Sequence, residues 1–111
     1  MDIEIKTFTE RKIKPIDVLS LYNETGWLQG RLDLDMEEIL NKVPSVGAWK
    51  GDTLIGYARA VSDGHYKAYI EDVVIHRLYM KKSIGIKLVS KLLDELSCNQ
   101  FILRKRLTAF L

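Results

Sequence analysis

The chain has 111 residues and a mass of 12.8 kDa, the size of one domain. Apolar residues make up 47% and charged residues 29%, which is typical of a globular protein whose core needs no disulfides or metal. A single cysteine excludes an internal disulfide framework, no apolar run reaches the roughly 18 residues of a membrane span, and the N-terminus is not a signal peptide. We therefore expect one domain over residues 1–111, located in the cytoplasm and without a membrane partner.

The net charge of +2 hides a basic C-terminal third. Residues 1–75 contain 9 Lys or Arg and 13 Asp or Glu, whereas residues 76–111 contain 8 Lys or Arg and 2 Asp or Glu. This excess of positive charge favours an anionic partner, and the alternative is a solvated basic face. A small nucleic-acid-binding module is a further alternative, but the basic end carries no recognised motif and no interleaved aromatic residues. No nucleic-acid partner is therefore expected.

The N-terminal part of the chain predicts a strand followed by two helices. Apolar side chains alternate over residues 3–8, which is typical of a half-buried strand. Pro15 suits the first position of a helix that ends at residues 23–26. A short second helix is expected over residues 36–42, with Asp35 as its cap and acidic residues in its first turn.

The middle of the chain predicts an antiparallel meander. Strands are expected over residues 46–50, 53–62 and 67–76, with turns at Gly51-Asp52 and Asp63-Gly64. The third strand is apolar enough to be buried on both faces. Simple alternation in the second strand predicts two faces, one with Ile55, Tyr57, Arg59 and Val61 and the other with Leu54, Gly56, Ala58 and Ala60.

The apolar period then changes to that of a helix. The spacing predicts an amphipathic helix over residues 83–96, with Ser83 as its cap. A helix start offers unpaired backbone N–H groups and a partial positive charge, which suit an anion. Lys81 and Lys82 oppose the helix dipole there, a penalty that a bound phosphate would reverse. The alternative is two exposed lysines on a loop.

Residues 69–76 (YIEDVVIH), 77–85 and 86–89 (IKLV) together resemble the core motif of the GCN5-related N-acetyltransferases, the GNAT family. The hairpin over residues 46–59 is similar to the second and third strands of that family, and the resemblance spans roughly residues 3 to 103. It implies an α+β fold, with a mixed, mostly antiparallel sheet flanked by helices in the order β-α-α-β-β-β-α. Residues 101–103 resemble the start of a partial fifth strand.

The resemblance implies transfer of an acetyl group from acetyl-CoA to an amine of a small molecule or peptide. In the family, the CoA pyrophosphate rests on backbone amides within a Gln/Arg-x-x-Gly-x-Gly/Ala signature, and the pantetheine arm pairs with the preceding strand. Only Gly85 keeps its expected type here, since Met80 stands for Gln or Arg and Ser83 stands for a glycine. The implied cofactor-binding residues are Val73, Val74, Ile75, Met80, Lys81, Lys82, Ser83, Ile84 and Gly85.

The resemblance also implies candidate catalytic and acceptor residues. Glu71 is the candidate base, because an acid at this strand position can face the acceptor amine; the alternative is an exposed or paired strand carboxylate. Asp72 is expected on the opposite face. Trp27 lies where the family builds its acceptor pocket, and the alternative is core packing. Tyr57 and Tyr69 are expected to be packing residues, and no metal site is expected.

Members of the family continue with a fifth strand, a helix and two closing strands, a part that carries the tyrosine that protonates the leaving thiolate. Here residues 104–106 (RKR) interrupt the fifth strand and the chain stops at Leu111. We therefore expect a truncated domain that forms a homodimer through an exposed sheet edge. Two functions follow: an acetyl-CoA-dependent N-acetyltransferase, active or impaired, or an inactive remnant that binds CoA weakly or acts through self-association.

Overall fold

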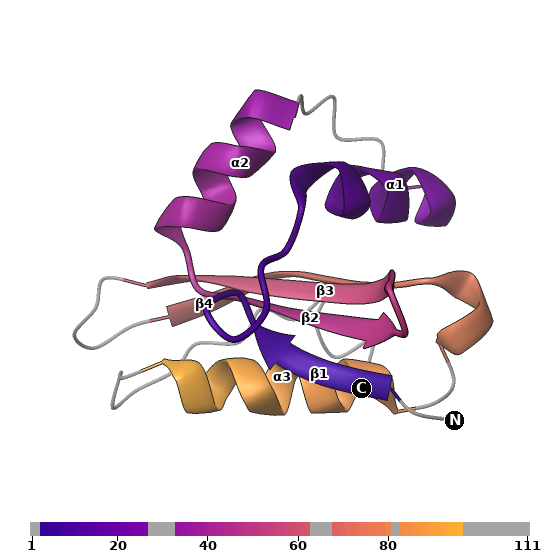
Figure 1. Ribbon diagram of the computed structural model, residues 1–111. Coiled ribbons are helices and arrows are strands. Elements are labelled where there is room, and N and C mark those ends of the chain that lie inside the picture. Colours follow the sequence, from indigo (N-terminus) through magenta and orange to yellow (C-terminus); the bar gives the residue numbers. More distant parts are fainter. Residues whose placement is uncertain (1–2, 27–32, 63–67, 81–82, 97–111) are drawn as a thin grey trace.

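A computed structural model describes residues 3–26, 33–62, 68–80 and 83–96. Four strands form one antiparallel sheet in the order β1-β2-β3-β4. Helices α1 and α2 cover one face of this sheet and α3 covers the other (Figure 1). The predicted α+β class and the order β-α-α-β-β-β-α are confirmed within the described residues. The elements are β1 (Ile3–Thr7), α1 (Pro15–Thr25), α2 (Asp33–Lys42), β2 (Ser45–Lys50), β3 (Thr53–Ser62), β4 (Ala68–Ile75), the 3-10 turn η1 (Arg77–Tyr79) and α3 (Ile84–Glu95).

The residues at the ends of the two N-terminal helices show where each helix begins or stops. Pro15 is the first residue of α1, as predicted, and Gly26 ends the helix at φ +81°, where its N–H bonds to the carbonyls of Tyr22 and Asn23. Helix α2 begins at Asp33, so the prediction that Asp35 caps a helix starting at residue 36 was wrong. With the helix beginning at Asp33, Glu37 and Glu38 lie beyond its first turn, so the prediction that acidic residues of a helix over 36–42 occupy the first turn was also wrong.

Helix α3 has the predicted extent, and Ser83 occupies the predicted N-cap position, but its side chain does not cap the helix. Ser83 precedes the helix in the left-handed region, at φ 60° and ψ 18°, and its side chain makes no capping hydrogen bond. An N-cap serine normally has extended backbone, from which its hydroxyl reaches the first amides of the helix. The prediction that Ser83 caps α3 through its side chain was therefore wrong.

The sheet carries a separate apolar core on each face. The core under α3 is built from helix residues such as Leu88 and Leu92 and from small strand residues such as Ala58 and Ala60. The core under α1 and α2 contains larger side chains, among them Trp49 and Tyr57. Burying apolar surface on both faces at ~25 cal/mol per Å² is the main stabilising term of such a domain.

A β-bulge in β3 changes the predicted faces near its start. Trp49 pairs with Leu54 and Ala48 pairs with Gly56, so Ile55 is an extra residue without a partner in β2. Leu54 therefore lies in the α1 core together with Tyr57, whereas Ile55 lies in the α3 core. The alternation that grouped Ile55 with Tyr57 was wrong at this point, because a bulge shifts the period of two by one residue.

Candidate active site

A second bulge, in β4, shapes the candidate site. Arg59 pairs with Asp72 and Ala60 pairs with Ile70, which leaves Glu71 as an extra residue of β4. Both carboxylates consequently contact the same side chain of β3, that of Arg59. The prediction that Asp72 lies on the face opposite to Glu71 was wrong, because the bulge cancels the alternation between these two neighbours.

Arg59 is the centre of a buried polar network. Its Nε donates to Glu71 Oε1 at 2.5 Å, its Nη2 lies 2.8 Å from Asp72 Oδ2, and its Nη1 donates to the Tyr22 hydroxyl at 3.3 Å. The Tyr22 hydroxyl in turn donates to Asp72 Oδ2 at 2.8 Å. The Arg59 side chain is 1% exposed, whereas the Glu71 side chain is 38% exposed. The network thus ends in one carboxylate that is accessible at the molecular surface.

Burial and charge set the protonation of this network. Burial, followed by the Asp72 carboxylate, raises the pKa of Tyr22 well above its ordinary value. Burial by itself would lower the pKa of Arg59, but Tyr22 and Asp72 outweigh it, so that the pKa is raised. Arg59 therefore stays a cation and Tyr22 a neutral hydrogen-bond donor throughout the physiological range.

The backbone of β4 after the bulge presents hydrogen-bonding groups away from β3. The N–H of His76 donates to the Ile55 carbonyl on β3 at 2.8 Å. Backbone groups alternate along a strand, so those of Val73 and Ile75 point to the other side of β4. Among the described strands, β4 has a neighbour on one side only. The side chains of Val73, Val74 and Ile75 are buried in the two cores, so a ligand along this strand would meet backbone groups.

The loop from β4 to α3 places the remaining predicted cofactor residues. Met80 is 50% exposed and Ser83 is exposed, whereas Ile84 and Gly85 are buried and could contribute backbone amides alone. Lys81 and Lys82 lie outside the described residues. The predicted residues therefore divide into two exposed side chains and a set of strand and helix-start backbone groups.

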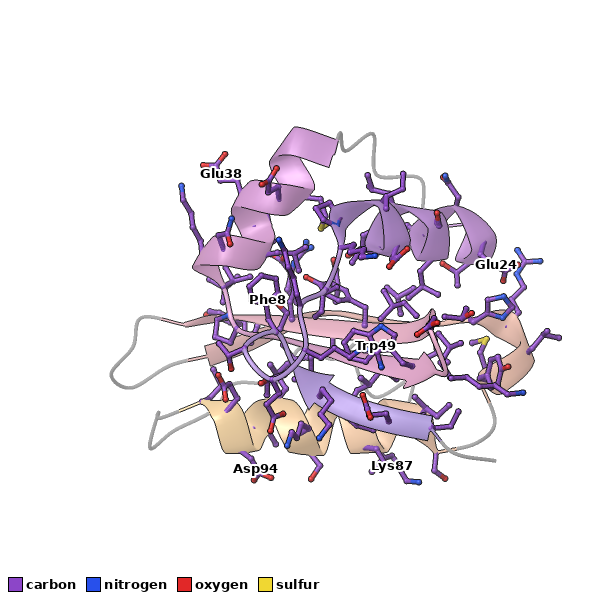
Figure 2. All side chains as sticks on the ribbon, viewed as in Figure 1. Phe8, Glu24, Glu38, Trp49, Lys87 and Asp94 are labelled. Atoms are coloured by element: carbon purple, nitrogen blue, oxygen red, sulfur yellow. The ribbon has the colours of Figure 1, made fainter. Side chains whose placement is uncertain are left out.

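The end of α1 contacts the beginning of this loop. The His76 ring accepts the N–H of Leu78 at Nδ1, over 3.2 Å, and so caps η1. Glu24, the α1 residue labelled beside η1 in Figure 2, accepts the backbone N–H of Arg77 at 3.5 Å. These contacts fix the start of the loop against the α1 layer.

Other sequence predictions have mixed outcomes. Trp27, the predicted acceptor-pocket residue, lies outside the described residues. Tyr57 packs in the α1 core, as predicted, and Tyr69 is half-buried. The roles of Tyr22 and Arg59 were missed, although a lone arginine between two alanines in a predicted, largely apolar strand was a signal that it needs a partner.

The described residues lack two structural features. Within them, no group of three or more His, Cys, Asp or Glu side chains is placed to hold a metal ion. None of the described helices is long and apolar enough to cross a membrane.

Comparisons with known proteins agree with this architecture. The profile of the Acetyltransferase (GNAT) family matches residues 13–107. An uncharacterized N-acetyltransferase, ycf52-like, from Prochlorococcus marinus is 30% identical in an alignment of 97 residues that covers 81% of this chain and 54% of that protein. The chain therefore spans about half the length of this curated relative.

Solved structures show the same fold. A GNAT-family acetyltransferase from Streptococcus pneumoniae superposes with a TM-score of 0.74 at 26% identity, over 94% of this chain and 76% of that one. A probable acetyltransferase from Staphylococcus aureus gives 0.75 at 18% identity, over 97% and 86% of the two chains. Acetyl transfer is the general chemistry of these proteins, and by the match over residues 13–107 this chain belongs to the GNAT acetyltransferase family.

Proposed function

We propose that the chain is an acetyl-CoA-dependent N-acetyltransferase that transfers the acetyl group to an amine of a small molecule or peptide. The observation that carries the proposal is the bulge in β4. It brings the accessible carboxylate of Glu71 beside a strand backbone, that of Val73 and Ile75, which points away from β3. A base and a row of backbone donors and acceptors are the two features that this reaction needs from a strand.

The described residues fit acetyl-CoA as the acyl donor. The backbone groups of Val73 and Ile75 could pair with the pantetheine arm in the manner of an added strand. The amides at the start of α3, which the Ser83 side chain does not cap, could hold the pyrophosphate, since a helix N-terminus attracts anions. When bound, acetyl-CoA supplies a thioester whose acyl carbon accepts the amine nitrogen while the C–S bond breaks and the sulfur leaves with the electron pair.

Glu71 is proposed as the base. As the N–C bond forms, the amine nitrogen loses a proton, and the Glu71 carboxylate takes it. The departing thiolate takes up a proton from solvent, so that the products are the acetylated amine and the free thiol. The anionic carboxylate would also attract a protonated amine to this part of the surface.

A second candidate is an inactive protein that binds CoA weakly or acts through self-association. Ser83 favours the inactive candidate. This residue has a left-handed backbone and carries a Cβ at a position where the family signature has glycine. That Cβ lies next to the helix amides proposed to hold the pyrophosphate. The two candidates differ in whether an acetylated product forms.

The test combines binding and turnover on the full chain. Calorimetry with acetyl-CoA measures binding, and release of free thiol with a panel of polyamines, aminoglycosides and peptide N-termini measures turnover, with the acetylated product identified by mass spectrometry. We expect binding, turnover with at least one amine, and a ~10²-fold loss of kcat in Glu71→Gln. The matched control is Glu38→Gln, since Glu38 points outward on α2 (Figure 2).

Each outcome assigns the protein to one candidate. Thiol release that Glu71→Gln reduces and Glu38→Gln leaves unchanged supports the proposal. Binding without turnover across the panel supports the inactive candidate. If millimolar acetyl-CoA produces no binding heat and no thermal shift, the acetyltransferase proposal is refuted.

A further inference from the structure

The guanidinium of Arg59 is a buried charge whose contacts extend in three directions. Taking a charge out of water costs several kcal/mol unless it is paired and hydrogen-bonded. Nε contacts Glu71, Nη2 contacts Asp72 and Nη1 contacts the Tyr22 hydroxyl, so every nitrogen of the group has a partner. Such a site fixes the orientation of the side chains that it holds.

Of these three partners, Glu71 alone is accessible at the surface. Asp72 and Tyr22 are buried, and their own 2.8 Å hydrogen bond anchors the inner side of the cluster to α1. Glu71 occupies the extra position of a bulge, where no cross-strand neighbour in β3 sets its register. Its contact with Arg59 Nε therefore selects one orientation from those that its side chain could adopt.

We propose that Arg59 is a positioning residue that, braced by Asp72 and Tyr22, holds the Glu71 carboxylate in one orientation beside the β4 backbone. This inference rests on the proposed function, in which Glu71 takes the amine proton. The planar fork of arginine suits the task, because its donors diverge in fixed directions. Lysine carries the same charge on a single nitrogen, whose donors cannot reach three partners in the separate directions that the arginine nitrogens serve.

The first test separates positioning from general stability. In Arg59→Lys we expect kcat to fall about 10²-fold, as for a misplaced catalytic group, with KM for acetyl-CoA within about twofold of wild type. The matched control is Arg11→Lys. Arg11 also pairs with a carboxylate, that of Glu4, but its guanidinium contacts the β2–β3 turn at Gly51, away from Glu71. In the Glu71→Gln background, Arg59→Lys should cause little further loss, because the two residues act as a unit.

Independent losses would overturn the inference. If Arg59→Lys reduces kcat as strongly in Glu71→Gln as in wild type, Arg59 does not act through Glu71. Should Arg59→Lys not fold, Tyr22→Phe removes one brace and keeps the charge. It should give a smaller loss of kcat, again absent in the Glu71→Gln background.

A second test does not depend on turnover. In the ¹⁵N-labelled full chain, the Nε–H resonance of Arg59 should be protected from exchange with water, and Glu71→Gln should shift it whereas Glu38→Gln should not. An unprotected resonance, or one that Glu71→Gln leaves in place, overturns the inference whatever the activity. A protected and responsive resonance in a chain without turnover refutes the proposed function and supports the positioning contact.

Discussion

The hydroxyl of Tyr22 on α1 donates a 2.8 Å hydrogen bond to Asp72 on β4, fifty residues further along the chain. The Tyr22 ring also meets the Tyr57 ring edge-on, with centroids 6.4 Å apart. The two tyrosines differ in one respect: the buried Tyr57 hydroxyl has no hydrogen-bond partner among the described residues. Two adjacent buried phenols thus allow a comparison of a bonded and an unbonded hydroxyl.

Removing each hydroxyl should have a different effect on stability. We expect Tyr22→Phe to lower the free energy of unfolding by about 1–3 kcal/mol, because it leaves Asp72 with one donor fewer in a buried site. Tyr57→Phe should be neutral or stabilising, because it removes a polar group buried without a partner. Urea denaturation of both variants measures the difference. Equal losses in the two variants would contradict this reading of the tyrosine pair.

Tyr22 should also make the protein sensitive to alkali. Its pKa is raised in the folded state, chiefly by burial, above the ordinary value of 10.0. The folded state therefore binds the phenol proton more tightly than the unfolded state, and this contribution is complete below pH 10 and lost as the pH rises above it. The difference in the free energy of unfolding between wild type and Tyr22→Phe should therefore stay constant up to about pH 9 and narrow between about pH 10 and about pH 11. A difference in urea midpoints that stays constant or widens between about pH 10 and about pH 11 would refute the prediction.

The sequence predicted the elements well where residue type marks a boundary. Pro15 gave the first residue of α1, and residues 53–62 gave the full extent of β3. It failed at the two bulges, because an inserted residue at Ile55 or Glu71 is not marked by its type and becomes apparent only through pairing with the next strand.

The candidate site was likewise predictable only in part from the sequence. The family motif led to Glu71, but its partner Arg59 lies twelve residues away on another strand. The register of β3 and β4 and the bulge bring the two together, and neither follows from local sequence. The left-handed backbone conformation of Ser83 could not be predicted either, because serine is a common helix cap and its backbone is then normally extended.

Gly56 leaves little room for a side chain between the sheet and α3. A Cβ at this position would lie 3.1 Å from Leu88 Cδ1 and 3.2 Å from Ala48 Cβ. We expect Gly56→Ala to lower the free energy of unfolding by about 1–3 kcal/mol through overpacking. Because Leu88→Ala removes the methyl that the new Cβ meets, the double variant should cost less than the sum of the single variants. Additive costs in thermal denaturation would show that the space relaxes elsewhere.

Ser83→Gly should improve acetyl-CoA binding if the start of α3 holds the pyrophosphate. Glycine adopts φ 60° without the penalty of about 1–2 kcal/mol that a Cβ incurs there, and it lets a ligand approach the backbone. We expect a several-fold lower Kd in calorimetry, with stability unchanged or slightly raised. In the control Ser90→Gly, on the exposed face of α3, stability should fall by about 0.5–1 kcal/mol and the Kd should stay the same. An unchanged Kd in Ser83→Gly would place the pyrophosphate elsewhere.

Self-association through the sheet stays a prediction. Among the described strands β4 pairs on one side only, and exposed strand edges tend to pair with other chains. The same backbone groups are proposed to bind pantetheine, so saturating acetyl-CoA should shift a dimer toward monomer. Light scattering with and without acetyl-CoA measures this shift, and a monomer at high concentration without ligand would contradict the prediction.

The bulge in β4 makes the number of residues in this strand as important as their identity. Ile70 and Val73 are an odd number of positions apart, yet both lie in the core under α3. Odd spacing normally sends two strand residues to opposite faces. Deleting the residue at position 71 would therefore leave Ile70 and Val73 an even number of positions apart, both still facing the core under α3. Such a deletion would remove the bulge and the Glu71 carboxylate while leaving the core intact, whereas a deletion elsewhere in β4 would send one half of its side chains to the opposite face.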